Sequence, residues 1–465
     1  MVDFVEGMPE ALSAEWQRAF GWVEAELGGR IVGARRQARW RPAWSLDLAR
    51  DGEIVPLYFR GARGEADHGA YSLEHEMGVL QVLEANDIPV PHIHGFCPDP
   101  RGIVMQRCSG RANLALARDD AEREAVLDDY VALLARIHAI DVSAFEKIGL
   151  ERPTTPRELG LGDFEIWERG YRRNKRRPEP LIEFVIGWVR RNIPHDRDGA
   201  SFLCGDSGQF LFEDGRVTTV LDLELAYLGD PAADLAGMRC RDLSEPLGDL
   251  SRAVRAYESI TGKPVDRSVI DYHTVRFAII TPLAVAHLVA EPPPGLDFVQ
   301  YLAWYLVYSR APIEVIANEM GLALSPVELP EAVRTRYSPG HDALKEMLAG
   351  DPASDANADH GAASDALDFD AYRLDAALRV AEYLRRADCM GPALERDDLD
   401  DVTALLGGRP ASWSQADEEL EDFVLEASPD RDGELVAYFH RRLLRQEALI
   451  DPVMRELKGA RIQSV

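Results

Sequence analysis

Residues 202–224 hold a set of polar side chains that could bind a hard cation and meet a substrate hydroxyl. Two β-rich arms flank the dipeptide Asp214-Gly215, which is a strong signal for a two-residue hairpin turn. The side chains that stand out along this segment are Asp206, Gln209, Asp222 and Glu224. Carboxylate and amide oxygens are the ligands that a hard cation such as Mg2+ prefers. The segment therefore predicts a cation site on a hairpin.

The register of this hairpin follows from counting outward from the turn. The count places three pairs opposite each other: Glu213 with Arg216, Leu211 with Thr218, and Gln209 with Val220. Because side chains alternate between the faces of a strand, Gln209, Asp222 and Glu224 then share one face. Gln209 and Asp222 become diagonal neighbours, roughly 7–8 Å apart. Asp206 lies on a glycine-flanked loop just before the hairpin, where it could meet a substrate hydroxyl. The alternative is that these acids belong to a turn and a surface, in a chain with 80 acidic residues.

Composition narrows the classes of function. The 465 residues include 80 Asp and Glu against 52 Lys and Arg, a net charge of -28 that disfavours nucleic acid or anionic lipid as a partner. The first residues lack the pattern of a signal peptide, and the longest apolar run, 277–290, is short for a membrane span. Five scattered cysteines without a CxxC indicate reduced thiols. We therefore expect a cytoplasmic protein with no nucleic-acid or membrane partner.

The elements that would position the hairpin are of two kinds. Residues 1–107 read as α+β, with expected helices at 14–27 and 72–85 and expected strands at 30–32, 45–48, 55–59 and up to 105. From Asp119 onward helical patterns dominate, as in the spacing of Val126, Tyr130, Leu133, Leu134 and Ile137. An Ala/Asp/Gly/Ser run indicates a flexible linker before an acidic helical end. The expected divisions are an N-terminal lobe at 1–107, a helical C-lobe at 108–349, the linker at 350–367, and an acidic helical domain at 368–465; the family resemblance described next implies that the N-terminal lobe is nucleotide-binding.

The hairpin segment resembles the catalytic core of the aminoglycoside phosphotransferase / choline kinase family. The residues that carry the resemblance are Cys204-Gly205-Asp206, Gln209, Leu221-Asp222-Leu223-Glu224 and the block GDPAADLA at 229–236. Upstream, Leu57-Tyr58-Phe59-Arg60 is similar to the third strand of the family, and Leu73-Glu74-His75-Glu76 to the start of its glutamate-bearing helix. The likeness covers about residues 20–320. It implies a protein-kinase-like two-lobed fold, with a small β-rich N-lobe, a larger helical C-lobe and here a C-terminal all-α appendage.

The resemblance also implies a role for each matching residue. Asp206 would orient or deprotonate the substrate hydroxyl. Gln209 and Asp222, assisted by Glu224, would hold Mg2+ between the phosphates of ATP (or GTP). Glu76 would pair with Arg60, which would contact those phosphates, and the backbone from Met105 to Arg107 would hold the adenine. Asp230 and Asp234 would tie loops and helix starts together.

Four departures from the family pattern leave a second hypothesis open. The phosphate-binding lysine is absent, since Lys147 is the first lysine of the chain, and Arg60 is the residue in register. The usual asparagine is Gln209, on a shorter loop, and the usual histidine is Cys204, which we expect to be buried and unreactive. The segment 33–42, expected over the phosphates, is rich in Arg and poor in Gly, so it is either a phosphate grip or a solvated turn. The alternative to an enzyme is a pseudokinase-like nucleotide-binding regulator without turnover.

The acceptor of the phosphate is expected to be a hydroxyl of a small molecule, either of hydroxyacyl type or of antibiotic or aminoalcohol type. The line-up, including the motif at 130–138, is nearer to kinases associated with acyl-CoA dehydrogenases. The basic run 172–177 is either a solvated helix face or a surface that steers an anionic acceptor. The C-terminal helical domain is expected to be dispensable for the folding of the two lobes, and to serve a protein partner or a homodimer.

Overall fold

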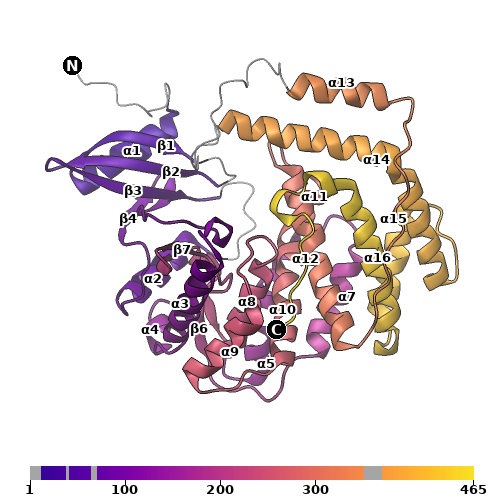
Figure 1. The fold of residues 1–465 in the computed structure, drawn as a ribbon, viewed down its shortest axis with the longest axis horizontal. Helices are drawn as coiled ribbons and strands as arrows, with labels where there is room; N and C mark the ends of the chain where they lie inside the picture. The colour runs from indigo at the N-terminus through magenta and orange to yellow at the C-terminus, as the bar shows by residue number, and fades with distance from the viewer. Residues whose placement is uncertain (1–11, 38–40, 64–70, 350–368) are drawn as a thin grey trace.

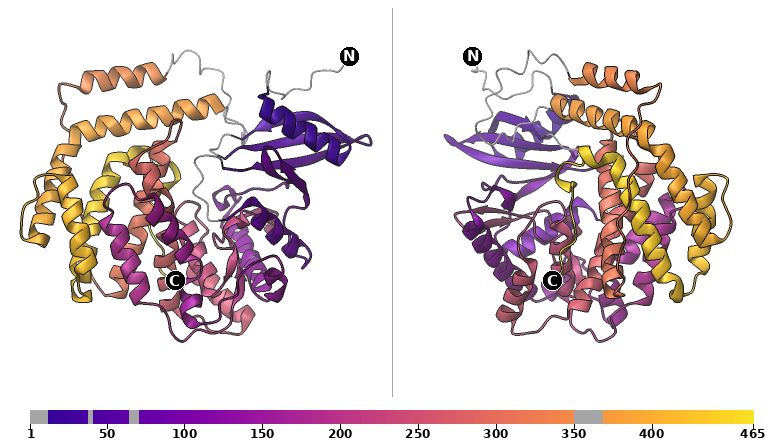
Figure 2. Two further views of the ribbon diagram at one scale, coloured as in Figure 1. Left: turned by 180° about the vertical axis from the view of Figure 1, so that it is seen from behind. Right: turned by 45° about the vertical axis from the view of Figure 1, so that its right-hand side comes forward.

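The structure of the chain is a computed structural model that describes residues 12–37, 41–63, 71–349 and 369–465 (Figure 1). The predicted linker at 350–367 lies outside the described residues. A β-rich lobe carries the N-terminal part of the chain, and helices make up most of the rest (Figures 1 and 2).

The N-terminal lobe is a five-stranded antiparallel sheet in the order β1-β2-β3-β5-β4. Its elements are α1 (Ala14–Leu27), β1 (Arg30–Arg36), β2 (Ala43–Arg50), β3 (Glu53–Gly61), α2 (Leu73–Glu84), β4 (Ile93–Pro98) and β5 (Arg101–Gln106). All of these were predicted from the sequence, within a few residues at their ends, except for β4, which the sequence indicated only as the partner of the strand ending at residue 105. The turn Asp51-Gly52 joins β2 to β3 with both residues at positive φ, as a tight hairpin requires.

The two helices cover opposite faces of this sheet, because side chains of a strand alternate. Phe59 and Val104 pack with α1 in one cluster, whereas Ile103 and Met105 pack with α2 in another. Ser72 caps α2, since its side chain accepts from the His75 N–H at 3.3 Å. Helix α2 therefore packs against β4 and β5, and a hydrogen bond from Arg60 to Glu76 at 2.8 Å links it to β3.

The second lobe is built from helices around short strands. Its elements are α3 (Asp120–His138), α4 (Ser143–Glu146), α5 (Pro156–Leu161), α6 (Phe164–Asn174), α7 (Pro180–Arg191), β6 (Ser201–Leu203), β7 (Phe210–Glu213), β8 (Arg216–Val220), η3 (Leu223–Leu225), β9 (Tyr227–Gly229), α8 (Ala232–Arg241), α9 (Leu250–Thr261), α10 (Arg267–Ala278), α11 (Ile280–Ala290) and α12 (Phe298–Glu319). The residues of α3 expected to share a face are all buried, which confirms the helical spacing.

The hairpin of β7 and β8 forms at the predicted turn, but its register differs from the prediction. Glu213 pairs with Arg216 as expected. An irregularity between Leu211 and Phe212 shifts the register, so that Leu211 lies opposite Thr219. A strand with one extra residue shifts every later pair, so Phe210 rather than Gln209 lies opposite Val220. The predicted alternation from Gln209 to Glu224 is therefore wrong.

The C-terminal helices complete the hydrophobic core of the second lobe. They are α14 (Phe369–Leu406), α15 (Trp413–Glu426) and α16 (Asp432–Ile450), whereas α13 (Ser338–Ala349) packs against α14 outside this core. Phe439 and Leu443 of α16 belong to the same buried cluster as Ile182 of α7 and Ile313 of α12. Helices α15 and α16 lie along α7 and α12 in both views (Figures 1 and 2). The C-terminal helical region is confirmed, but its helices share a core with the C-lobe, which contradicts the expectation that folding can dispense with them.

One stretch of helix has the length and composition to cross a membrane. It spans residues 267–290, and 72% of its apolar window is buried inside the protein. In the structure it consists of α10 and α11, which pack against α8, α6 and α12.

Candidate active site

The loop that carries Asp206 is held by hydrogen bonds to the GDPxxD block at 229–234. Asp234, at the start of α8, accepts hydrogen bonds from the backbone N–H groups of Cys204 at 2.8 Å and of Gly205 at 2.9 Å. His138 contacts the same carboxylate at 3.0 Å. Gly205 has φ of 79°, and a Cβ there would lie 2.3 Å from the carbonyl oxygen of Leu225. The hydrogen bonds to Asp234 and the close contact with Leu225 thus fix the backbone of Gly205, the residue before Asp206.

Asp230, the first acid of the block, also serves the backbone. Its Oδ1 accepts from the N–H of Ala232 at 2.9 Å, at the first turn of α8, and Arg197 forms an ion pair with it. The expected role of Asp230 and Asp234 in tying loops and helix starts together agrees with these contacts.

Asp206 carries its carboxylate between two donors that reach the same oxygen. Gln209 Nε2 donates to Oδ2 at 2.8 Å, and Arg241 Nη1 lies 3.3 Å from Oδ2. Burial raises the pKa of Asp206 to about 6; the Arg241 guanidinium opposes this shift, and the nearby Asp222 adds to it. Both of these contacts from the described residues are to Oδ2, which leaves Oδ1 for a further hydrogen bond.

Arg60 of β3 joins the two lobes. Its Nε donates to Glu76 of α2 at 2.8 Å, so the expected pair of strand arginine and helix glutamate is present. Its Nη2 donates to Asp222 and lies 3.2 Å from Glu224. Burial alone would lower the pKa of Arg60, but the three carboxylates outweigh it and raise that pKa well above its usual value. Arg60 therefore stays charged in a buried site.

Two further arginines meet at Glu224. Arg41, just before β2, and Arg63, just after β3, each donate to the Glu224 carboxylate through Nη2. Arg41 also lies 4.0 Å from Glu76. Their side chains are 5% and 9% exposed. Of the Arg-rich segment 33–42, Arg41 thus points into the site, whereas Arg39 lies outside the described residues.

The three predicted metal ligands lie around these groups in different backbone settings. Gln209 precedes β7, Asp222 has a left-handed φ of 57° after β8, and Glu224 lies in η3. The amide nitrogen of Gln209 donates to Asp206, so the amide oxygen is the atom that could serve as a metal ligand. Two carboxylates and one amide oxygen are a donor set that suits Mg2+. Within the described part of the chain, no group of three or more His, Cys, Asp and Glu side chains is arranged to hold a metal ion.

The expected adenine contacts lie at the end of β5. The backbone N–H of Gln106 donates to the His92 carbonyl at 2.8 Å, and that of Arg107 donates to the Pro56 carbonyl at 3.0 Å. These two N–H groups are therefore committed within the protein, and the Gln106 carbonyl also accepts from the Cys108 thiol at 3.9 Å. The Arg107 side chain turns to Asp47, at 2.7 Å, and Met105 is buried beneath the sheet.

Cys204, which departs from the family pattern, and the basic run 172–177 each have a structural explanation. Cys204 is 2% exposed, and burial, together with the charge of Asp234, raises the pKa of its thiol well above the usual value. It is the buried and unreactive residue that was expected. In the basic run, Arg172 and Lys175 form ion pairs with Glu183, so part of that run stabilises the helix pair α6 and α7.

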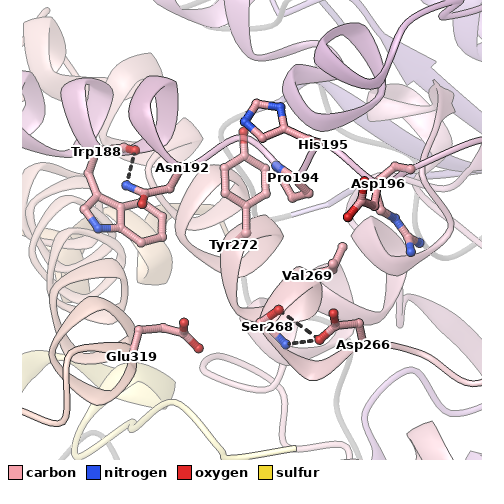
Figure 3. A pocket seen from close by; sticks show the side chains of 11 residues that line it. Trp188, Asn192, Pro194, His195, Asp196, Asp266, Ser268, Val269, Tyr272 and Glu319 are labelled. Carbon is pink, nitrogen blue, oxygen red and sulfur yellow. Dashed lines mark hydrogen bonds between the residues drawn. The ribbon is translucent and has the colours of Figure 1, made fainter.

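A pocket elsewhere on the second lobe takes in none of the predicted site residues. It has a volume of about 320 Å3 and lies between the end of α7, the start of α10 and the end of α12 (Figure 3). Trp188, Asn192, Tyr272 and Glu319 are among the residues that line it.

Sequence reasoning missed two residues of the site, Arg63 and Arg241. Arg63 follows the third strand by only two residues, and its signal was the absence of any lysine in the N-terminal lobe. Arg241 ends the helix that the GDPxxD block begins, seven residues after Asp234. That spacing is two helical turns, which brings Arg241 to the same side of α8 as the aspartate that fixes the loop.

A small antiparallel sheet lobe and a helical lobe face each other across an acidic loop, a hairpin and a strand arginine paired with a helix glutamate. Residues 48–272 match the family model described as the phosphotransferase enzyme family. Over these residues, which make up slightly less than half of its length, the chain is similar to that family.

The relatives and solved structures that resemble the chain are as follows. Acyl-CoA dehydrogenase family member 10 of Mus musculus is 28% identical over 181 residues, which cover 36% of this chain and 16% of that protein. Acyl-CoA dehydrogenase family member 11 of Gallus gallus is 28% identical over 223 residues, which cover 42% of this chain and 28% of that protein. The chain thus spans less than a third of the length of these relatives.

Among solved structures, macrolide 2'-phosphotransferase of Brachybacterium faecium is 19% identical with a TM-score of 0.44, covering 59% of this chain and 94% of that one. An aminoglycoside phosphotransferase in its apo form is 14% identical with a TM-score of 0.45, covering 65% of this chain and 99% of that one.

Proposed function

We propose that the protein transfers the γ-phosphate of ATP, with Mg2+, to a hydroxyl group of a small molecule. The observation that carries this proposal is the arrangement of Asp206, with one free carboxylate oxygen, opposite the buried arginine Arg60 across a set of carboxylates. Phosphoryl transfer needs an oriented nucleophile, positioned phosphates and neutralised charge, and this site offers a residue for each.

The residues divide the work as follows. Asp206 Oδ1 would accept the hydrogen bond of the acceptor hydroxyl and take its proton as the oxygen–phosphorus bond forms, while the bond from the γ-phosphorus to the bridging oxygen breaks and ADP leaves. Arg60, held by Glu76, would contact the phosphates. Gln209, Asp222 and Glu224 would hold Mg2+, which when bound neutralises charge on the phosphates. Asp234 keeps the backbone before Asp206 fixed, so that the carboxylate does not need to be ordered during the reaction.

For the acceptor, we favour a hydroxyacyl-type molecule over a cationic antibiotic. The relatives that match this chain are named as acyl-CoA dehydrogenase family members, which supports an acyl substrate. The charge of the site agrees, since the guanidinium of Arg241 lies 3.3 Å from Asp206 and would repel a polycationic acceptor. Its Nε is a buried donor without a hydrogen-bond partner among the described residues, and an oxygen of the acceptor would fit that donor.

The test is an assay of the full chain with ATP, Mg2+ and two acceptors, a hydroxyacyl-coenzyme A thioester and hygromycin B. We expect phosphorylation of the thioester and none of the antibiotic. Asp206→Asn should lower kcat by at least about a thousandfold, because the asparagine cannot take the proton, while calorimetry shows AMP-PNP binding within about twofold of wild type. An absence of turnover with every hydroxylated acceptor, in a protein that binds AMP-PNP, would favour the regulator hypothesis instead.

A further inference from the structure

The strongest unexplained feature of the site is a buried cluster of three arginines and three carboxylates. Arg41, Arg60 and Arg63 approach from the N-terminal lobe, and Asp222 and Glu224 approach from the second lobe. Glu76 of α2 is the third carboxylate. All three guanidinium groups contact Glu224, so one carboxylate that is expected to hold Mg2+ is covered by three cations.

Formal charges in this cluster cancel, which makes a single added ligand unfavourable. A divalent cation alone would have to take Asp222 and Glu224 from arginines that are more than nine-tenths buried, and would leave those arginines unpaired. A nucleotide alone would take the arginines and leave the carboxylates unpaired. When both bind, the phosphates receive the arginines, the cation receives the carboxylates, and every charge keeps a partner.

We propose that Arg41 and Arg63 are phosphate-binding residues alongside Arg60, and that the three arginines exchange Asp222 and Glu224 for the nucleotide phosphates. This inference rests on the proposed function. It assigns to side chains the role that backbone amides of a glycine-rich loop would otherwise fill, and guanidinium groups suit it because they bind phosphate in a bidentate fork. Metal and nucleotide then bind with strong positive coupling.

The geometry of Arg60 shows how the exchange can occur without disordering the site. Its Nε is bound to Glu76 at 2.8 Å, while its Nη2 serves Asp222 and Glu224. The two ends of the guanidinium therefore have separate partners. The Nη2 end can move to a phosphate while Glu76, which is 3% exposed, continues to hold the Nε end.

The test is the variant Arg63→Gln, which removes one cation and keeps the backbone position. Without nucleotide, Mn2+ titrated by electron paramagnetic resonance should bind about tenfold more tightly, because Glu224 is less covered. With Mg2+ present, AMP-PNP in a calorimeter should bind about tenfold more weakly, because one charge-assisted contact is lost. Opposite changes are the signature of exchange, since damage to the fold would weaken both.

Arg101→Gln is the matched control, because Arg101 is an exposed N-lobe arginine whose partner is the exposed Glu74, outside the cluster. It should change neither affinity. As a second variant, Glu224→Gln should strengthen AMP-PNP binding in the absence of Mg2+ and reduce the coupling. If wild-type protein binds no AMP-PNP, the proposed function itself fails. If it binds AMP-PNP, but both affinities fall together or neither changes in Arg63→Gln, the exchange is wrong and the proposed function stands.

Discussion

Asp206 is the residue whose surroundings bear most directly on the rate of the proposed reaction. It is 24% exposed, and its pKa is raised to about 6, chiefly by burial, with Arg241 opposing the shift. An acid with a raised pKa is protonated over a wider range of low pH, and the protonated form cannot take a proton from an acceptor. Under the proposed function, in which Asp206 takes the proton of the acceptor, activity should therefore be lost below this pKa and present above it.

The pH profile of kcat/KM checks this environment. We expect kcat/KM to rise with pH and to level off above an apparent pKa of about 6. Arg241→Gln removes the group that opposes the shift, so the rising limb should move to higher pH. The control is Arg252→Gln, which removes an arginine paired with Glu124 and Asp128 away from the site and should leave the limb in place. A limb that stays fixed in Arg241→Gln would show that Arg241 does not set the charge of Asp206.

At the scale of the element, α8 is the support of the catalytic loop. Its first turn presents Asp234 to two backbone N–H groups, and its last turn presents Arg241 to the loop aspartate. The first and the last turn of one helix thus both hold the loop.

Substituting Asp234 tests that support. Asp234→Ala leaves the N–H groups of Cys204 and Gly205 buried without an acceptor, which should cost about 3 kcal/mol of unfolding free energy and lower kcat sharply. Asp234→Asn retains one acceptor oxygen and should lose less of both. Urea denaturation and steady-state kinetics measure the two effects. Equal losses in the two variants would mean that the negative charge, and its contact with His138, matters more than the hydrogen bonds to the loop.

The sequence predicted the elements of this site better than their register. The turn at Asp214-Gly215, the helix face of α3 and the Arg60–Glu76 pair could be predicted because each depends on local spacing or on the family pattern. The irregularity between Leu211 and Phe212 could not be predicted, since the alternation of side chains does not reveal an extra residue in a strand. Arg63 and Arg241 were missed for another reason: their partners are 161 and 35 residues away, on other elements.

At the scale of the whole molecule, the C-terminal helices are joined to the second lobe by a shared hydrophobic core and by several ion pairs. Arg310 of α12 donates to Glu447 of α16 at 2.6 Å, and Arg191 of α7 lies 2.8 Å from Asp432. Phe439 of α16 is fully buried against Phe184 of α7. The C-terminal helices are therefore part of the lobe that carries the active site.

Removing these helices should expose that core. We expect a chain that ends at Ala349 to be recovered mainly as aggregate, because the apolar faces of α7 and α12 lose their cover. Phe439→Ala is the milder version and should lower the free energy of unfolding by about 3–5 kcal/mol. Soluble yield, sedimentation and denaturant unfolding measure these outcomes. A soluble, cooperatively melting chain of 349 residues would restore the view that the lobes fold alone.

The use of arginine in place of lysine at Arg60 has a chemical consequence. The chain has five lysines, and none precedes Lys147, so no lysine amine from the first lobe can line the cleft. Thioesters and other acylating agents modify neutral amines, whereas a guanidinium stays protonated and is a poor nucleophile. The acyl acceptor proposed for this site would therefore leave the cations of the first lobe unmodified. Reagents directed at amines should also leave these cations intact. Phenylglyoxal, which is directed at guanidinium groups, should react slowly with Arg41, Arg60 and Arg63, because their side chains are more than nine-tenths buried.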